Sequence, residues 1–248
     1  MSKPVTPPDL SGRAAVVTGG GSGIGRALAL ALTDLGATVW VVGRRRSVLL
    51  ETASLRSGQI HPFVGDVADA ALAESLASTV AEATDGTLAV LVNNAGVLGP
   101  RAPLLDYPQE DFEEVFRVNV FGVSIVTRAL LPLLLSEAPG SVVVNLSSGV
   151  GRVGRAQWGA YAASKFAVEG LTQVWADELR TSGVSVHALN PGATRTAMRA
   201  EAKPEEDPST LPTPTDIVPS LLYLLSPEAA GPSRTGQSID ARDFMVTS

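Results

Sequence analysis

Residue types that often carry chemistry are absent or rare in this sequence. It contains no cysteine, which excludes disulfide bonds, thiolate metal sites and a cysteine nucleophile. Its two histidines, His61 and His187, have no acidic or histidine partner at the spacing of metal ligands. We therefore interpret both as structural histidines and expect no metal site.

Positive charge and long apolar runs are also scarce. The chain has 19 basic and 25 acidic residues and a net charge of −6, whereas a nucleic-acid-binding protein normally carries a basic patch. The N-terminal segment MSKPVTPPDLSGR has no apolar core of a secretory signal. The most apolar run, Ala129–Leu135, is too short to cross a bilayer. We expect a cytoplasmic protein with neither nucleic acid nor a membrane as its partner.

The sequence does contain a regular alternation of short β-branched runs and longer helical patterns. The runs are apolar on both faces, which indicates strands of a sheet that is covered on both sides. They lie at residues 14–18, 38–42, 60–64, 88–92, 141–147 and 184–190. This alternation predicts an α/β fold, a single-domain, doubly wound parallel sheet of the Rossmann-like type, with about seven strands and helices on both faces.

A glycine-rich segment, TGGGSGIG at residues 18–25, joins the first predicted strand to the helical stretch Ile24–Leu35. Glycines there permit a tight turn and let a diphosphate approach the backbone, where the N–H groups of the helix start are free. A turn that only reverses the chain is the alternative. The position between a strand and a helix favours a dinucleotide-binding turn.

The spacing of this segment, a TGxxxGIG motif, resembles the short-chain dehydrogenase/reductase family. The resemblance continues over about residues 12–236 with Asn93-Asn94-Ala95-Gly96 (NNAG), Asn119, Ser148, Tyr161-x-x-x-Lys165 (YxxxK) and Pro191-Gly192. It implies an NAD(P)-dependent oxidoreductase that interconverts an alcohol and a ketone or aldehyde. The implied partners are a small carbonyl or alcohol substrate and further copies of the chain, in a homodimer or homotetramer.

The resemblance assigns the catalytic roles to Asn119, Ser148, Tyr161 and Lys165. Tyr161 would exchange the proton that carbonyl reduction requires, although a free tyrosine, with a pKa of about 10, is a poor base near neutrality. Lys165 is four residues further on, hence on the same side of a helix, and its ammonium group is expected to lower that pKa. Ser148 would hold the substrate oxygen, and Asn119 a water that links Lys165 to solvent.

The resemblance also implies a series of contacts to the cofactor. Asp66 would hold the adenine amino group, with helix capping or a turn as the alternative. Thr196 would contact the nicotinamide carboxamide, and the alternative is a simple turn residue. Residues 93–96 would line the adenosine ribose or form a turn held by asparagine side chains. The implied set is Gly19, Ser22, Gly23, Ile24, Gly25, Asp66, Val67, Asn93, Ala95, Gly96, Tyr161, Lys165, Pro191, Gly192, Thr194 and Thr196.

The end of the second predicted strand bears on the choice of cofactor. An acidic residue there accepts hydrogen bonds from the ribose, whereas an arginine favours the 2′-phosphate of NADP(H). Gly43 is followed by Arg44, Arg45 and Arg46, and cations at a helix start are unfavourable without an anion. We predict NADP(H), with Arg44 as its contact. The alternatives are an NAD-dependent alcohol dehydrogenase of the same family and a cofactor-binding regulator without turnover.

The rest of the chain is divided as follows. Residues 1–12 are expected to form a flexible tail and residues 13–248 the single domain. The region around residues 195–214 stands where the family has its substrate lid. It is acidic and rich in proline, so we expect a flexible insertion there.

Two long helical regions, Pro108–Glu137 and Trp158–Ser182, complete the picture. The second contains many small residues, which suit either tight packing on the sheet or a subunit interface. After Thr235-Gly236 the chain lacks the glycine pair that many relatives have. The family's packing at the C-terminus is therefore not carried over to this chain.

Overall fold

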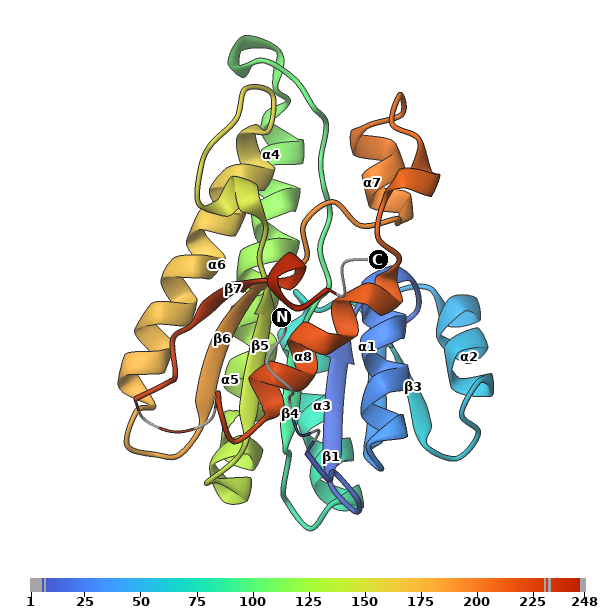
Figure 1. The fold of residues 1–248 in the computed structure, drawn as a ribbon, viewed down its shortest axis with the longest axis vertical. Coiled ribbons are helices and arrows are strands. Elements are labelled where there is room, and N and C mark those ends of the chain that lie inside the picture. Colours follow the sequence, from blue (N-terminus) through green and yellow to red (C-terminus); the bar gives the residue numbers. More distant parts are fainter. Residues whose placement is uncertain (1–5, 7, 230, 232, 246–248) are drawn as a thin grey trace.

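The computed structural model describes residues 6, 8–229, 231 and 233–245 of the chain. Within this part, seven parallel strands form one sheet in the order β3-β2-β1-β4-β5-β6-β7, and helices cover both of its faces (Figure 1). The order reverses between β1 and β4, because β2 and β3 are added on one side of β1 and the later strands on the other. The predicted doubly wound parallel sheet is confirmed.

The strands follow the predicted apolar runs closely, and a further strand lies near the C-terminus. Their bounds are β1 Ala14–Thr18, β2 Thr38–Gly43, β3 Ile60–Val64, β4 Val90–Asn93, β5 Val142–Leu146, β6 Ser185–Asn190 and β7 Ser238–Asp240. β4 begins at Val90 and not at residue 88. The reason is that the N–H of Leu88 donates to the carbonyl of Leu133 in a covering helix, at 3.1 Å, rather than to a neighbouring strand.

The helices fill the intervals between the strands. The α-helices are α1 Gly23–Asp34, α2 Arg46–Ser54, α3 Ala70–Ala83, α4 Gln109–Phe116, α5 Gly122–Glu137, α6 Gly159–Glu178, α7 Ala197–Ala202 and α8 Val218–Leu225. Short 3₁₀ helices are η1 Leu104–Asp106, η3 Gly149–Gly151, η4 Pro208–Thr210, η5 Pro214–Ile217 and η6 Ala241–Phe244. A π-helical turn, η2 Arg117–Phe121, joins α4 to α5.

The first predicted long helical region is therefore one rod, α4-η2-α5, and the second is α6. The rod, Gln109–Glu137, is long and apolar enough to cross a membrane, but half of its most apolar window is buried inside the fold. No other helix in the described part of the chain has that length and composition. We conclude that the rod is a core helix.

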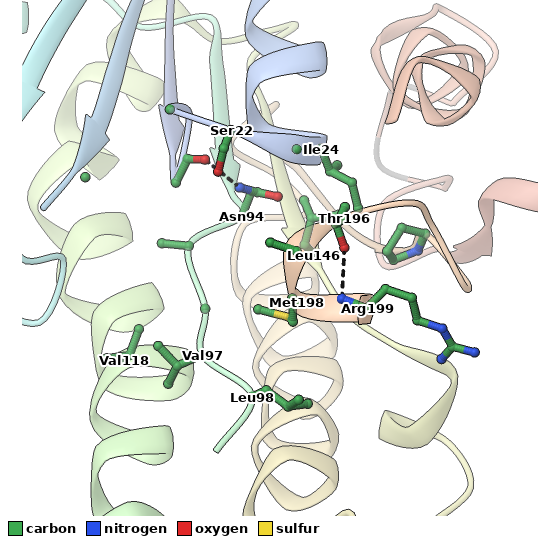
Figure 2. Close-up of a pocket in the computed structure, with 18 of the residues that line it drawn as sticks. Ser22, Ile24, Asn94, Val97, Leu98, Val118, Leu146, Thr196, Met198 and Arg199 are labelled. Carbon is green, nitrogen blue, oxygen red and sulfur yellow. Dashed lines mark hydrogen bonds between the residues drawn. The ribbon is translucent and has the colours of Figure 1, made fainter. Parts of the chain in front are cut away.

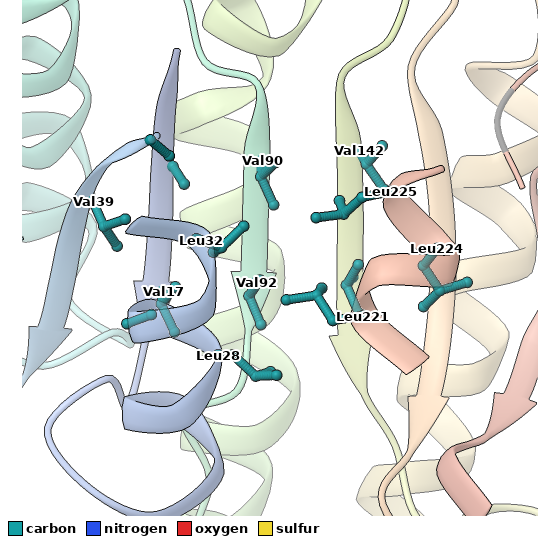
Figure 3. Close-up of a cluster of buried hydrophobic side chains, with 14 of the residues drawn as sticks. Val17, Leu28, Leu32, Val39, Val90, Val92, Val142, Leu221, Leu224 and Leu225 are labelled. Carbon is teal, nitrogen blue, oxygen red and sulfur yellow. The ribbon is translucent and has the colours of Figure 1, made fainter. Parts of the chain in front are cut away.

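The strands β1, β2, β4 and β5 send alternate side chains into two separate hydrophobic cores. In one core Val17 and Val92 pack with Leu28 of α1 and Leu221 of α8 (Figure 3). Val16 belongs to the other core, together with side chains of α3, α5 and α6. Burial on both faces explains why the strand sequences are apolar at nearly every position.

A ladder of buried polar side chains connects the central strands to the helices. The Nδ2 group of Asn93 donates to Asn145 Oδ1 and to Thr127 Oγ1, both at 2.9 Å. Asn145 Nδ2 in turn donates to Thr172 Oγ1 of α6 at 2.9 Å. All four side chains are buried, and a fully satisfied buried network specifies one arrangement of the elements that share it. The ladder thus fixes β4 and β5 relative to α5 and α6.

Half of the N-terminal segment that we expected to be a flexible tail, residues 1–5 and 7, lies outside the described residues. Leu10, however, is 2% exposed and packs in the core with α1. Its N–H donates to the carbonyl of Leu35 at 2.9 Å. The packed part of the chain thus includes Leu10, ahead of the expected domain start at residue 13.

Candidate active site

A pocket of about 420 Å³ lies over the carboxyl ends of the strands, where the strand order reverses between β1 and β4. Open α/β sheets bind ligands at this place because the loops that leave the two strands diverge. Figure 2 shows the chain from Asn94 to Leu98 on one side of the pocket, and Thr196, Met198 and Arg199 on the other. The pocket therefore lies between the sheet and the segment expected to be a lid.

The glycine turn after β1 has a backbone that side chains would disturb. Gly19 and Gly23 have φ angles of +65° and +52°. A Cβ atom on Gly25 would lie 2.3 Å from the carbonyl oxygen of Gly19, so α1 can pack on the turn only with glycine at this position. Asn94 Nδ2 holds the turn from β4 by donating to the carbonyls of Thr18 and Gly19, at 2.9 and 3.2 Å.

The start of α1 is prepared for an anion. Ser22, its N-cap residue, makes no side-chain capping bond, and the first turn has no acidic residue. The N–H groups there therefore keep their capacity for a phosphate. Arg26 does not supply the charge at this point, because its guanidinium group donates to the Gly21 carbonyl at 2.7 Å and pairs with Glu51 at 2.8 Å. Arg26 instead restrains the glycine turn by holding the carbonyl of Gly21.

Charged side chains meet at the end of the pocket beside β2 and β3. Arg117 bridges two carboxylates, Asp66 at 2.9 Å and Glu114 at 2.6 Å. Arg44 lies 3.8 Å from Glu114, with 58% of its side chain exposed. Arg44 precedes α2, whose first turn has no acidic residue. Its guanidinium group is thus a weakly paired cation at the mouth of the pocket.

Asp66 lines this end of the pocket, as the resemblance implied, and does not cap α3. The cap is Asp69, which accepts a hydrogen bond from the N–H of Ala71 at 2.9 Å. Burial by itself raises the pKa of Asp66, but hydrogen bonds from the N–H of Ala68 and from Arg117 together lower it below its ordinary value. Asp66 is therefore an ionised acceptor beside the pocket.

Tyr161, Lys165 and Ser148 meet at the other end of the pocket. Lys165 Nζ is buried, donates to the carbonyl of Leu146 at 2.6 Å and lies 5.7 Å from the centre of the Tyr161 ring. Ser148 follows β5 and hydrogen-bonds the Tyr161 hydroxyl group. The phenol, the ammonium group and the serine hydroxyl thus form one polar group, which Trp158 flanks with its ring 5.9 Å from that of Tyr161.

The pKa values of the pair correct one expectation from the sequence. Burial raises the pKa of Tyr161 to about 12, and the hydrogen bond with Ser148 offsets only part of this effect. Burial also lowers the pKa of Lys165 to about 8, against the opposite influence of Glu169. The expected lowering of the tyrosine pKa by lysine is therefore wrong for this state of the protein, because the cost of desolvating a phenolate is larger. Near neutral pH Tyr161 is a protonated acid beside a charged lysine.

Asn119 lies in the π-helical turn and is fully buried, but it does not line the pocket. Its Oδ1 accepts from the N–H of Val97 at 2.8 Å, and its Nδ2 donates to the Val97 carbonyl at 2.9 Å and to Ser164 Oγ at 3.0 Å. Ser164 Oγ donates to the Tyr161 carbonyl at 2.8 Å. The side chain of Asn119 therefore positions the pocket wall and the start of α6.

The region around residues 195–214, which we expected to be flexible, forms α7 and two short 3₁₀ helices. Arg199 makes a paired ion bridge to Glu206, at 2.5 and 2.7 Å, and Arg195 donates to the carbonyls of Ser209 and Leu211 at 3.2 and 3.1 Å. Thr196 caps α7 by accepting from the N–H of Arg199 (Figure 2). The segment is therefore held by its own contacts.

The structure brings most of the implied cofactor-binding residues to this one pocket. Those that line it are Gly19, Ser22, Gly23, Ile24, Arg44, Asp66, Val67, Ala95, Gly96, Tyr161, Lys165, Pro191, Gly192, Thr194 and Thr196. Gly25 and Asn93 do not. Gly25 packs beneath the glycine turn, and Asn93 is 3% exposed within the polar ladder. The wall residue is therefore Asn94, which follows the end of β4, and Asn93 belongs to the sheet.

The histidines lie away from the pocket. His61 stacks on Trp40, with the ring centres 5.2 Å apart. His187 is fully buried in β6, and neither ring nitrogen has a hydrogen-bond partner in the described part of the chain. Burial lowers the pKa of His187 to about 4. Among the described residues no group of three histidine, cysteine, aspartate or glutamate side chains could hold a metal ion.

Comparison with known proteins agrees with the geometry of this site. The family model described as short chain dehydrogenase matches residues 13–207. The chain belongs to the short-chain dehydrogenase family. This family consists of NAD(P)-dependent oxidoreductases, and the dehydrogenase described here has the glycine turn and the tyrosine–lysine pair at opposite ends of one pocket.

Individual relatives match from three quarters to nearly all of the dehydrogenase. An uncharacterized oxidoreductase of Escherichia coli, YciK, is 42% identical over 242 residues, 94% of this chain and 93% of its own. An NADPH-dependent pterin aldehyde reductase of Arabidopsis thaliana is 38% identical over 191 residues, 76% and 78% of the two chains. A short chain dehydrogenase from Shigella flexneri, solved in complex with NADP, superposes with a TM-score of 0.87 at 39% identity and covers 96% and 100%.

The two neighbouring asparagines provide a test of this site. We expect Asn94→Ala to weaken binding of the nicotinamide cofactor roughly tenfold, because the glycine turn loses two hydrogen bonds. Asn93→Ala should instead lower the free energy of unfolding by about 1–3 kcal/mol, since its buried partners lose their donor, and should leave cofactor affinity nearly unchanged. Calorimetric titration and denaturant unfolding measure the two effects. Equal losses of affinity in both variants would contradict the assignment.

Proposed function

We propose that the protein is an NADP(H)-dependent carbonyl reductase that interconverts a ketone or aldehyde and an alcohol. The single observation that supports this most strongly is the contact between Ser148, Tyr161 and Lys165 in the pocket that also contains the glycine turn. A protein that only bound the cofactor would need the turn but not an acid beside a buried ammonium group. The two ends of the pocket therefore support catalysis together.

The residues of the pocket fit a dinucleotide. The free N–H groups at the start of α1 would hold its diphosphate, Asp66 its adenine amino group, and Gly192 and Thr194 the nicotinamide end. When bound, the cofactor supplies or accepts the hydride. Arg44 would pair with a 2′-phosphate, because in the part of the chain that the structure describes its guanidinium group has no closer acidic partner than Glu114, at 3.8 Å.

The proton chemistry belongs to the protein. With a pKa of about 12, the Tyr161 hydroxyl is protonated near neutral pH and can donate its proton to a carbonyl oxygen. Ser148 is placed to orient that oxygen by a second hydrogen bond. The phenolate that remains on Tyr161 would be stabilised by the Lys165 ammonium group, which faces the ring.

The substrate end of the pocket is mainly apolar. Leu98, Val97 and Met198 line it (Figure 2). Trp158 stands beside Tyr161. We therefore expect a substrate whose carbonyl group is flanked by an apolar or aromatic portion. The NADPH-dependent aldehyde reductase among the relatives supports an aldehyde or ketone as the substrate class.

NADP(H) is favoured over NAD(H) as the cofactor. Arg44 supplies the positive charge, and the short chain dehydrogenase from Shigella flexneri was solved with NADP. We also expect a homodimer or homotetramer. Exposed apolar side chains on the two long helical regions support it. Among them are Phe121 at the end of η2, with 57% exposed, and Phe166 and Val174 of α6, with 46% and 51%.

Tyr161→Phe tests the catalytic role directly. We expect it to reduce NADPH oxidation with a panel of aldehydes and ketones by roughly a thousandfold or more, because the proton donor is lost. Cofactor affinity should stay within a few fold. Tyr223→Phe, outside the pocket, is the matched control and should retain full activity. Retained turnover in Tyr161→Phe would refute the role, and failure of the native protein across a broad panel with intact binding would favour a regulator.

Arg44→Ala tests the cofactor. We expect the dissociation constant for NADPH to rise roughly tenfold or more and that for NADH to change little, because only the 2′-phosphate loses a partner. Arg46→Ala, which changes an exposed neighbour that does not line the pocket, should alter neither. Calorimetric titration of both cofactors gives the comparison. Tighter binding of NADH than of NADPH by the native protein would show that NAD-linked activity is the correct alternative.

A further inference from the structure

A cluster of charged side chains, one buried and two partly exposed, lies directly behind the reacting end of the pocket. Glu169 of α6 is 7% exposed and accepts from Ser147 Oγ at 2.5 Å, from Ser238 Oγ at 2.6 Å and from Arg152 Nε at 3.2 Å. Arg152 also pairs with Asp240 of β7 at 3.0 Å. None of these side chains lines the pocket apart from Ser147. We call Glu169, Arg152 and Asp240 the rear charge cluster.

Short chains of neighbouring residues and hydrogen bonds connect the rear charge cluster to the residues of the pocket. Glu169 is one helical turn after Lys165, so both lie on the same side of α6. Ser147, which donates to Glu169, immediately precedes Ser148. On the other side, Asp240 accepts from Asn190 Nδ2, and Asn190 Oδ1 holds the N–H of Gly192 at 3.0 Å.

The charges of the cluster do not cancel among themselves. Two carboxylates share one guanidinium group, which leaves one uncompensated negative charge in a largely buried region. The Lys165 ammonium group, which is 6% exposed, supplies the missing positive charge. With Lys165 charged, the four groups are neutral as a set; if Lys165 were neutral, a net negative charge would be left in a low-dielectric surrounding.

The other charged groups near α6 do not have this role. The helix packs against β5, β6, η2, η3 and α4. β5 and η3 contain no ionisable side chain, and His187 of β6 stays neutral because burial lowers its pKa to about 4.

The charged groups of η2 and α4 are paired elsewhere or lie far away. Arg117 of η2 forms ion pairs with Asp66 and with Glu114 of α4. On α4, Glu113 accepts from Gln109 at 3.0 Å, and Glu110 and Asp111 lie in the first turn, at its far end from Asn119. Glu169 is the carboxylate that acts on Lys165.

We propose that Glu169 is a positioning residue whose charge, set by Arg152 and Asp240, keeps the buried Lys165 ammonium group protonated and holds the strand end before Ser148. The inference rests on the proposed function for its catalytic meaning, but the charge relation itself does not. It also gives the C-terminus a role. Asp240 ends the strand β7, just before the place where many relatives have a glycine pair, and it is tied to Arg152 and Asn190.

The proposal predicts opposite effects for two neighbouring substitutions. Glu169→Gln removes the compensating negative charge and should lower the pKa of Lys165 by about one pH unit or more. Arg152→Gln leaves both carboxylates uncompensated and should raise it by a similar amount. Asp240→Asn should lower it to a smaller extent. A general loosening of the structure would not produce changes of opposite sign.

The chain is suited to a direct measurement, because its lysines are at positions 3, 165 and 203 only. The full-length protein, labelled with ¹³C-lysine, is titrated by NMR without cofactor, and the Lys165 Cε resonance is assigned by its loss in Lys165→Arg. Glu178→Gln, an exposed carboxylate at the end of the same helix, is the matched control and should leave the pKa of Lys165 unchanged.

Each outcome decides the question. A lower pKa of Lys165 in Glu169→Gln together with a higher one in Arg152→Gln supports the proposal. An unchanged lysine pKa in either variant, or a shift of the same sign in both, overturns it. If Glu169→Gln does not fold, the pKa of Lys165 is compared in the other two variants. A higher pKa in Arg152→Gln together with a lower pKa in Asp240→Asn supports the proposal, and an unchanged pKa in Arg152→Gln overturns it. Because no turnover is measured, failure of the proposed function would leave these results unaffected.

Discussion

The burial of one ammonium group is the constraint on which the rest of the site depends. Lys165 lies inside the fold with its Nζ on the Leu146 carbonyl, and burial lowers its pKa to about 8. Glu169 opposes this effect, and Lys165 remains charged near neutral pH. That retained charge stands beside a tyrosine whose own pKa is raised to about 12. The combination gives a protonated acid and, next to it, the cation that can stabilise its conjugate base.

The sheet topology brings this pair to the cofactor end of the molecule. The glycine turn follows β1, and Ser148 follows β5, so both lie at the same edge of a parallel sheet. The reversal of strand order between β1 and β4 opens the space between them. The polar ladder through Asn93 and Asn145 keeps β4 and β5 in register with α6. The distance between the glycine turn and the tyrosine–lysine pair is thus set by the fold.

Much of this could be predicted from the sequence, because it depends on local patterns. Strands buried on both faces are apolar throughout, and the spacing of Tyr161 and Lys165 reports a shared helix face. The wrong or missed features depend on three-dimensional surroundings. Whether Asn93 or Asn94 reaches the pocket depends on where β4 ends, and the tyrosine pKa depends on desolvation. Glu169 gains one of its partners, Ser238, from β7, which is distant in sequence.

The central claim is that a hydride is transferred within the pocket to the carbonyl carbon of a substrate, and that the protein supplies the proton. The most direct measurement uses NADPH deuterated at C4 of the nicotinamide ring and a panel of aldehydes and ketones, with the products analysed by mass spectrometry. The account predicts one deuterium at the carbinol carbon of the product for each NADPH oxidised. Oxidation of NADPH without deuterium in any alcohol product would contradict it.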